Sequence, residues 1–355
     1  MKPLKLMLAV LSAFGLMLSA TPGQAATAVK LSTHASPSSA LFTALSELKN
    51  YVEEKTNGKY EIELYDSYKL GSMESSYQGL QVGTVHFLVE GPSNLSNFIP
   101  MFQLFDMGFI FPNADIADQV LCGPIGDKIL KEATNKVSTP LCFLRNNDRV
   151  LWTTKPITSL DDLKGLKLRG SSSKSHIALL KAMGMTPIPM AGSEVYTSLQ
   201  QGVVEGVDVT LGYGVASRWY EAAPNLFLSN HVYLPQLLYV STRWWNKLPE
   251  EDRAIFEEGI RRYQDKERVL SQAEERDSLK YLAEQGVKIT IPTAEQYAQM
   301  AEMVKDVPAQ FPKVDQALLK ELMDAGQAIL KNNTAATADT AAAPAADSAA
   351  APAGN

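Results

Sequence analysis

The chain has 355 residues, 45% of them hydrophobic, and its 33 lysines and arginines against 39 aspartates and glutamates give a net charge of −6. A chain this acidic is not attracted electrostatically to nucleic acid or to an anionic membrane surface, so neither is an expected partner. Its length is enough for two lobes with separate cores. An anion-binding site in such a chain would have to rely on individually placed arginines.

Residues 1–25 have the composition of a secretory signal peptide. Lys2 and Lys5 precede an apolar run, and small residues end the segment at Ala25. The run is shorter than the roughly 20 residues that a spanning helix needs. We therefore predict export to the periplasm with cleavage after Ala25, and losing Lys2 and Lys5 takes the net charge from −6 to −8.

Strands and helices alternate in the first part of the chain. The patterns predict a strand at 28–35, a helix at 38–56, a strand at 59–65, a helix at 70–83 and a strand at 84–91. This order is typical of parallel βαβ units. We assign residues 26–147, with a return segment at about 234–262, to a first lobe.

A second α/β lobe is predicted for residues 148–233 with C-terminal segments at about 263–331. Its expected elements are two short strands within 145–170, a small helix begun at Ser159, helices at 172–184 and 193–202, and strands at 185–190 and 203–211. A strand pattern at 237–248 is followed by one long helix at 249–286, with proline at its start and glycine at its end. At 1.5 Å per residue this helix is on the order of 50 Å long, so it braces two lobes or is kinked.

The C-terminal residues 332–355 are small, polar and interrupted by prolines. With no large apolar side chains to bury, they are predicted to form a disordered tail.

The two cysteines, Cys122 and Cys142, either form a disulfide in an oxidising compartment or are small buried side chains. We favour free thiols, since the sequence cannot supply the Cβ geometry of a disulfide.

Arg169 stands at the end of a short apolar strand, before a serine-rich turn. A guanidinium matches a carboxylate with two parallel hydrogen bonds and is easier to desolvate than a lysine ammonium. Ligands of open α/β sheets bind beyond the carboxyl ends of the strands, where His34 and Glu90 also stand. The position of Arg169 therefore indicates an organic-acid site.

Four sequence motifs, in the same order along the chain, resemble those of the solute receptors of tripartite ATP-independent periplasmic (TRAP) transporters, of the dicarboxylate-receptor type. They are TNGKYEIELYDSYKLGS, LQVGTVHFLV, SNFIPMFQLFDMGFIF, and DDLKGLKLR followed by EVYTSLQQGVVEG. The resemblance runs from about Val29 to about Ile291. It implies a two-lobe periplasmic binding protein (class II-like) of α/β class, with a long helix spanning both lobes.

The resemblance also implies a function. The two lobes close on a small organic acid and deliver it to TRAP membrane subunits. Arg169 corresponds to the arginine that holds the substrate carboxylate, and Arg149 is the best match to an assisting arginine, with Arg145 as a rival. We expect a monomer without enzymatic activity, cofactor or metal.

One departure from the family pattern concerns the ligand. The family usually continues the turn after the strand as acid-Asn-Pro, whereas this chain has Asp208-Val209-Thr210. Because Val209 offers only methyl groups, an apolar or aromatic carboxylate is expected, with Trp152 or Tyr213 as packing partners.

Other polar candidates have structural explanations beside the functional one. Glu90 and Ser93 fit a turn cap at Gly91-Pro92 as well as a binding site, and His34 fits an ordinary loop histidine. Catalytic motifs such as GxSxG, HExxH and a P-loop are absent from the sequence. The alternatives are a receptor for an ABC importer or a sensor, and an exported enzyme acting on a small acid.

Overall fold

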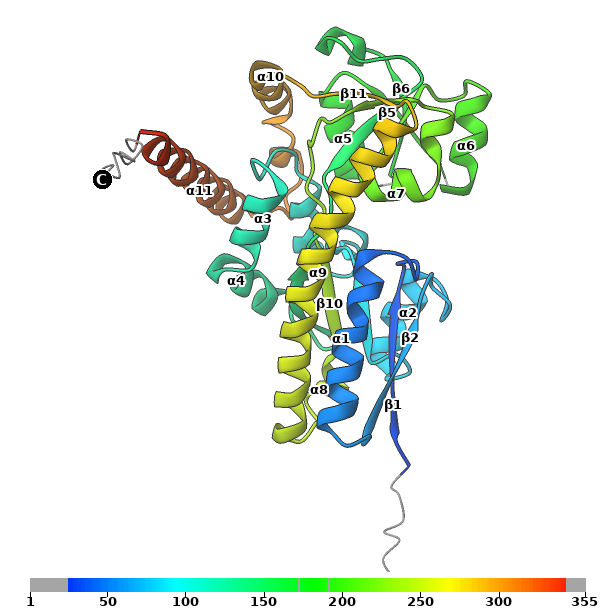
Figure 1. Cartoon of the computed structure of the whole chain (residues 1–355), viewed down its shortest axis with the longest axis vertical. Coiled ribbons are helices and arrows are strands. Elements are labelled where there is room, and N and C mark those ends of the chain that lie inside the picture. Colours follow the sequence, from blue (N-terminus) through cyan, green and yellow to red (C-terminus); the bar gives the residue numbers. More distant parts are fainter. Residues whose placement is uncertain (1–24, 172, 191, 343–355) are drawn as a thin grey trace, which may run out of the picture.

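Two β-sheets joined by one long helix organise the molecule (Figure 1). The computed structural model describes residues 25–171, 173–190 and 192–342. The predicted signal peptide lies, apart from its last residue, outside the described residues. Among the residues that are described, no helix combines the length and apolar character needed to cross a membrane.

The first sheet has the strand order β2-β1-β3-β10-β4. Its strands are β1 (Thr27–Thr33), β2 (Tyr60–Tyr65), β3 (Phe87–Glu90), β4 (Ser138–Leu144) and β10 (Gln236–Ser241). The first three are mutually parallel, which confirms the predicted βαβ order, and β10 runs antiparallel between β3 and β4. The return segment thus adds a central strand to this sheet.

Helix α1 (Ala40–Lys55) shows how local sequence positions the first lobe. Ser39 caps its first turn by accepting a hydrogen bond from the Phe42 backbone N–H. Its apolar face, including Leu48, is buried against the long helix α9 (Glu250–Glu284). Gly259 of α9 permits this close approach, since a Cβ there would lie 3.0 Å from Leu48 Cδ1.

The second sheet has the order β11-β9-β5-β8-β6-β7. Its strands are β5 (Arg149–Thr153), β6 (Lys167–Gly170), β7 (Thr186–Pro189), β8 (Gly206–Thr210), β9 (Asn225–Phe227) and β11 (Lys288–Thr290). Strands β6, β7 and β8 run parallel, while β5 is antiparallel to both β8 and β9. The register places Arg169, near the end of β6, beside Val207 near the beginning of β8.

Helices cover these sheets and fill the space between them. They are α2 (Met73–Val82), α3 (Ala114–Leu121), α4 (Pro124–Ala133), α5 (Lys174–Ala182), α6 (Gly192–Gln200), α7 (Leu211–Ala216), α8 (Thr242–Trp245), α10 (Ala294–Val304) and α11 (Gln316–Ala342), with short 3-10 helices η1 (Pro92–Leu95), η2 (Pro100–Asp106), η3 (Leu160–Leu163), η4 (Trp219–Glu221) and η5 (Pro308–Gln310). The long helix is α9, with 35 residues. It begins after Pro249, ends before Gly286, and extends along both lobes in Figure 1, which confirms the prediction.

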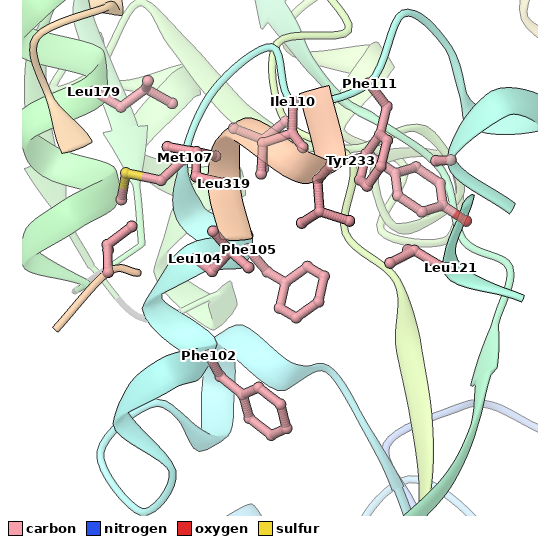
Figure 2. Close-up of a cluster of buried hydrophobic side chains, with 14 of the residues drawn as sticks. Phe102, Leu104, Phe105, Met107, Ile110, Phe111, Leu121, Leu179, Tyr233 and Leu319 are labelled. Atoms are coloured by element: carbon pink, nitrogen blue, oxygen red, sulfur yellow. The ribbon is translucent and has the colours of Figure 1, made fainter. Parts of the chain in front are cut away.

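The two lobes share two further connections and part of one core. The segment from β4 to β5 pairs with the segment from β9 to β10 through an isolated bridge between Asp148 and Tyr233. A hydrophobic cluster extends from Leu88 of the first sheet to Leu168 of the second. Figure 2 shows part of it, in which side chains of the 102–111 segment lie near Leu179 and Tyr233.

Helix α11 corrects the predicted boundary of the C-terminal tail. The tail was expected to begin at residue 332, but the helix continues to Ala342. Alanine is the strongest helix former, and the first proline of the segment comes only at Pro344, so nothing in the sequence stops the helix earlier. Residues 343–355 lie outside the described residues. In Figure 1, α11 projects beyond α3.

Candidate functional site

A cavity of about 670 Å³ lies between the lobes. Most of its lining side chains are polar, and they come from both lobes and from the connecting segments. The lining residues are Tyr68, Met73, Glu74, Gly91, Ser93, Asn94, Ser96, Asn97, Gln103, Asp106, Arg149, Ser171, Ser173, Lys174, Ser175, Leu234, Gln236 and Phe311. The predicted residues Arg149 and Ser93 are therefore both in the cavity wall.

Two lining atoms lack a hydrogen-bond partner. Ser93 Oγ and the side-chain carbonyl oxygen of Gln236 are both buried, and neither is hydrogen-bonded to any residue that the structure describes. A buried polar atom without a partner costs free energy, on the order of 1–3 kcal/mol. These two atoms therefore favour a ligand that brings its own hydrogen-bonding groups.

Arg149 begins β5 and is held from behind by the carboxylate of Asp208. Its Nη1 donates to Asp208 Oδ1 and to the Asp208 backbone oxygen, both at 3.0 Å. Asp208 is fully buried on β8; burial opposes its ionisation, but Arg149 and two histidines outweigh burial and hold the pKa well below its usual range. Arg149 is thus positioned at the cavity with its charge balanced.

Arg169 is half-buried on β6 and is not among the residues that line the cavity, but it is close enough to Arg149 of the cavity wall to feel the charge of that arginine. Among the described residues, Nε and Nη2 of Arg169 donate only to the backbone oxygen of Met190, at 3.4 and 3.3 Å, which are long hydrogen bonds. No acidic side chain of the described residues forms an ion pair with it. Burial, followed by the nearby charge of Arg149, lowers the pKa of Arg169. Its guanidinium therefore carries a charge that the surrounding protein leaves unbalanced.

Glu90 is buried at the end of β3 and supports the cavity wall from behind. It accepts hydrogen bonds from the Gly91 backbone at 2.8 Å, from Asn94 Nδ2 at 2.7 Å, and from the Tyr68 hydroxyl. The hydrogen bonds from Gly91 and Asn94 fit the turn-cap interpretation of Glu90. Tyr68 and Asn94, which Glu90 holds, both line the cavity. His34 is half-buried nearby, with its ring 6.1 Å from that of Tyr68.

Two of the three side chains expected to receive an apolar ligand, Val209 and Trp152, lie away from the cavity. Val209 and Trp152 are buried in the core of the second lobe, 7% and 0% exposed. The Trp152 ring packs against Gly214, where a Cβ would lie 2.5 Å from the ring. Tyr213 on α7 is half-exposed, its ring 5.2 Å from that of Trp219, and it is close enough to act electrostatically on Arg169 and Tyr68.

Arg145, the rival of Arg149, is buried in a network behind the connecting segments. Its guanidinium contacts Asp118 at 2.7 Å, Asp115 at 2.9 Å and Glu275 of α9 at 3.1 Å. Tyr233 also donates to Asp118, at 2.7 Å. Arg145 therefore joins both connecting segments to the long helix, and of the two candidates it is Arg149 that lines the cavity.

Most polar residues of the cavity wall are not identified by the sequence alone, among them Asp106, Ser173 and Ser175. Asp106 is buried at the end of η2, and its Oδ2 accepts hydrogen bonds from Ser173 and Ser175 at 2.7 and 2.6 Å. The available signal was an acid inside an apolar run, FQLFDMGF, together with the serine-rich turn. Neither sequence indicates that the segment with Asp106 and the serine-rich turn lie in contact in the folded protein.

The described part of the chain has no group of three or more histidine, cysteine, aspartate or glutamate side chains arranged to hold a metal ion. Cys122 is exposed and Cys142 is buried, and both are free thiols. What the cavity offers is mainly polar side chains together with the cationic groups of Arg149 and Lys174, an arrangement suited to binding an anion.

A two-lobed α/β fold with such a cavity defines the class of solute-binding receptors, and the comparisons agree. Residues 31–315 match the bacterial extracellular solute-binding protein family 7, to which the chain belongs. It is 29% identical over 284 residues to the C4-dicarboxylate-binding periplasmic protein DctP of Rhodobacter capsulatus, covering 79% of this chain and 84% of that protein. The predicted TRAP-receptor resemblance is confirmed.

Solved structures show the same fold. A TRAP periplasmic solute-binding protein from Ochrobactrum anthropi, with a C-terminus bound in its ligand-binding pocket, has a TM-score of 0.83 at 26% identity, over 88% of this chain and 98% of that one. A TRAP periplasmic solute-binding protein from Haemophilus influenzae with bound L-gulonate has a TM-score of 0.77 at 32% identity, over 85% and 99%. The predicted two-lobe architecture is confirmed.

Proposed function

We propose that this protein is the periplasmic receptor of a TRAP transporter, and that it binds an organic acid between its lobes and delivers it to the membrane permease. The observation that carries the proposal is Arg169, a half-buried guanidinium with no acidic partner among the described residues, within electrostatic reach of Arg149 in the wall of a polar interlobe cavity. The predicted signal peptide supports export, and we propose that the receptor acts as a monomer without catalysis.

In this proposal Arg169 binds the ligand carboxylate and Arg149 assists it. Because Asp208 already balances the charge of Arg149, Arg169 provides the net positive charge. Its long hydrogen bonds to Met190 are readily exchanged for shorter, charge-assisted ones to a carboxylate. Ligand contacts in both lobes would favour the closed arrangement by their differential affinity for it.

We further propose a hydroxylated acid as the ligand. Ser93 Oγ and the side-chain carbonyl oxygen of Gln236 lack hydrogen-bonding partners among the described residues, and a ligand hydroxyl group can both donate and accept. The structure from Haemophilus influenzae holds L-gulonate, an acid of this kind. An apolar or aromatic acid is expected from Val209, with Trp152 or Tyr213 as packing partners, and the burial of Val209 and Trp152 in the core does not support that ligand class.

Isothermal titration calorimetry with four compounds tests the proposal. L-gulonate, succinate and benzoate represent hydroxylated, aliphatic and aromatic acids, and D-glucitol is the matched polyol that lacks the carboxylate of L-gulonate. We expect L-gulonate to bind most tightly and D-glucitol not to bind. Tightest binding of benzoate would refute the ligand class, and binding of D-glucitol as strong as that of L-gulonate would refute carboxylate recognition.

A further inference from the structure

A buried cluster behind Arg149 is not explained by carboxylate binding alone. Asp208 of β8 is the centre of this cluster and is fully buried. Its Oδ1 accepts from Arg149 Nη1 at 3.0 Å, while its Oδ2 is hydrogen-bonded to His176 Nε2 and lies 3.5 Å from His231 Nε2. One carboxylate is thus shared by an arginine of the cavity wall and two buried histidines.

The cluster fixes the orientation of the Arg149 guanidinium. Both of its hydrogen bonds to Asp208 use Nη1, and they lead to the side-chain and the backbone oxygen of the same residue. A guanidinium has five N–H groups, so Nε and Nη2 retain three. Among the described residues these three have no hydrogen-bond acceptor. Asp208 therefore holds the Arg149 guanidinium through Nη1 alone, and Nε and Nη2 remain available to a ligand.

Each histidine has one buried ring nitrogen without a hydrogen-bond partner among the described residues, Nδ1 of His176 and Nε2 of His231. His231 Nδ1 is hydrogen-bonded to the Ser229 hydroxyl at 2.8 Å. The two rings are nearly parallel, with centroids 6.4 Å apart. The charged groups that face His176 are Asp208 of β8, Arg149 of β5 and Asp106 of η2.

The balance of charge changes when a carboxylate binds. Asp208 and Arg149 cancel one another, and with neutral histidines the cluster has no net charge; burial lowers the pKa of His176 and favours this neutral form. A bound carboxylate adds a negative charge beside Arg149. That charge favours the protonated form of a nearby histidine, and by linkage a ligand that promotes protonation binds more tightly at lower pH.

We propose that His176 and His231, acting through Asp208, position Arg149 for the ligand carboxylate, and that His176 makes the affinity for that carboxylate rise as the pH falls. Both histidines are positioning residues, since neither lines the cavity. This inference rests on the proposed function, because it requires a carboxylate ligand in the interlobe cavity.

The test is the dissociation constant of L-gulonate and benzoate, two monocarboxylates that stay ionised between pH 8.0 and 5.5. For the tighter ligand, we expect the wild-type affinity to rise on acidification, by up to about tenfold for each unit that the ligand adds to a histidine pKa. Calorimetry in two buffers of different ionisation enthalpy should show proton uptake on binding, a measurement that needs no variant.

Glutamine at both positions, His176→Gln with His231→Gln, retains N–H donors but cannot titrate. We expect this variant to bind with an affinity that does not change with pH, while the control His86→Gln, a half-buried histidine on the first sheet, keeps the wild-type profile. A wild-type affinity that is constant with pH, or an unchanged profile in the double variant, would overturn the inference but leave the receptor function standing. No binding of any acid at either pH would overturn both.

Discussion

Replacing Arg145 with methionine should destabilise the protein by about 3–5 kcal/mol, the usual cost of leaving a buried charge without its partner. The Arg145 side chain is 4% exposed and Asp118 is 10% exposed, so their 2.7 Å contact is shielded from water. Asp115 is 67% exposed and contributes little to the loss, while Glu275 at 29% is intermediate. Most of the expected destabilisation therefore comes from Asp118.

Urea denaturation followed by circular dichroism measures this change as a lower midpoint. Arg218→Met is the matched control, since Arg218 pairs with Glu221 on the surface at 70% exposure and should lose less than about 1 kcal/mol. Adding Asp118→Asn to Arg145→Met should recover part of the stability, because the uncompensated charge is then gone while an acceptor for Tyr233 stays. A loss for Arg145→Met no larger than that of the control would refute the reasoning.

Two further predictions concern packing and pH. Gly214→Ala should cost about 1–3 kcal/mol in urea denaturation, because its Cβ would lie 2.5 Å from the fully buried Trp152 ring; an unchanged midpoint would contradict this. Burial raises the pKa of Glu267 from 4.5 to about 7. The protonated carboxyl group therefore contributes its full share to the stability of the fold below pH 4.5, and this contribution is lost as the pH rises through 7. Relative to Glu267→Gln, the wild type should lose about 3 kcal/mol of stability over that interval, and parallel pH profiles of the two proteins would exclude it.

The periodic parts of the fold could be predicted from the sequence because their patterns are local. Helix α9 follows from a proline start, a glycine stop and a long polar sequence between them, and α1 follows from its cap and apolar face. The end of α11 was placed too early because an alanine-rich segment was interpreted by its lack of a core rather than by its helix propensity.

The site could be predicted only in part, because the side chains of successive residues in a β-strand point to opposite faces of the sheet. Arg169 and Arg149 were identified as candidates by residue type and position, but Val209 was assigned to the ligand when it faces the core. Its neighbour Asp208 points to the other side of the sheet and holds Arg149. A single sequence cannot say which side of β8 faces the cavity, since successive residues alternate. The contact of Asp106 with two serines depends on tertiary structure alone.

The central claim is that Arg169 binds the carboxylate of the ligand, and one affinity comparison tests it most directly. The dissociation constant of the tightest acid is measured by calorimetry for the wild type, for Arg169→Met, and for Arg262→Met as a control on the exposed side of α9. Loss of a desolvated charge pair costs about 2–5 kcal/mol, so Arg169→Met should weaken binding at least about 30-fold while the control is unchanged. An affinity for Arg169→Met within a few-fold of the wild type would contradict the account.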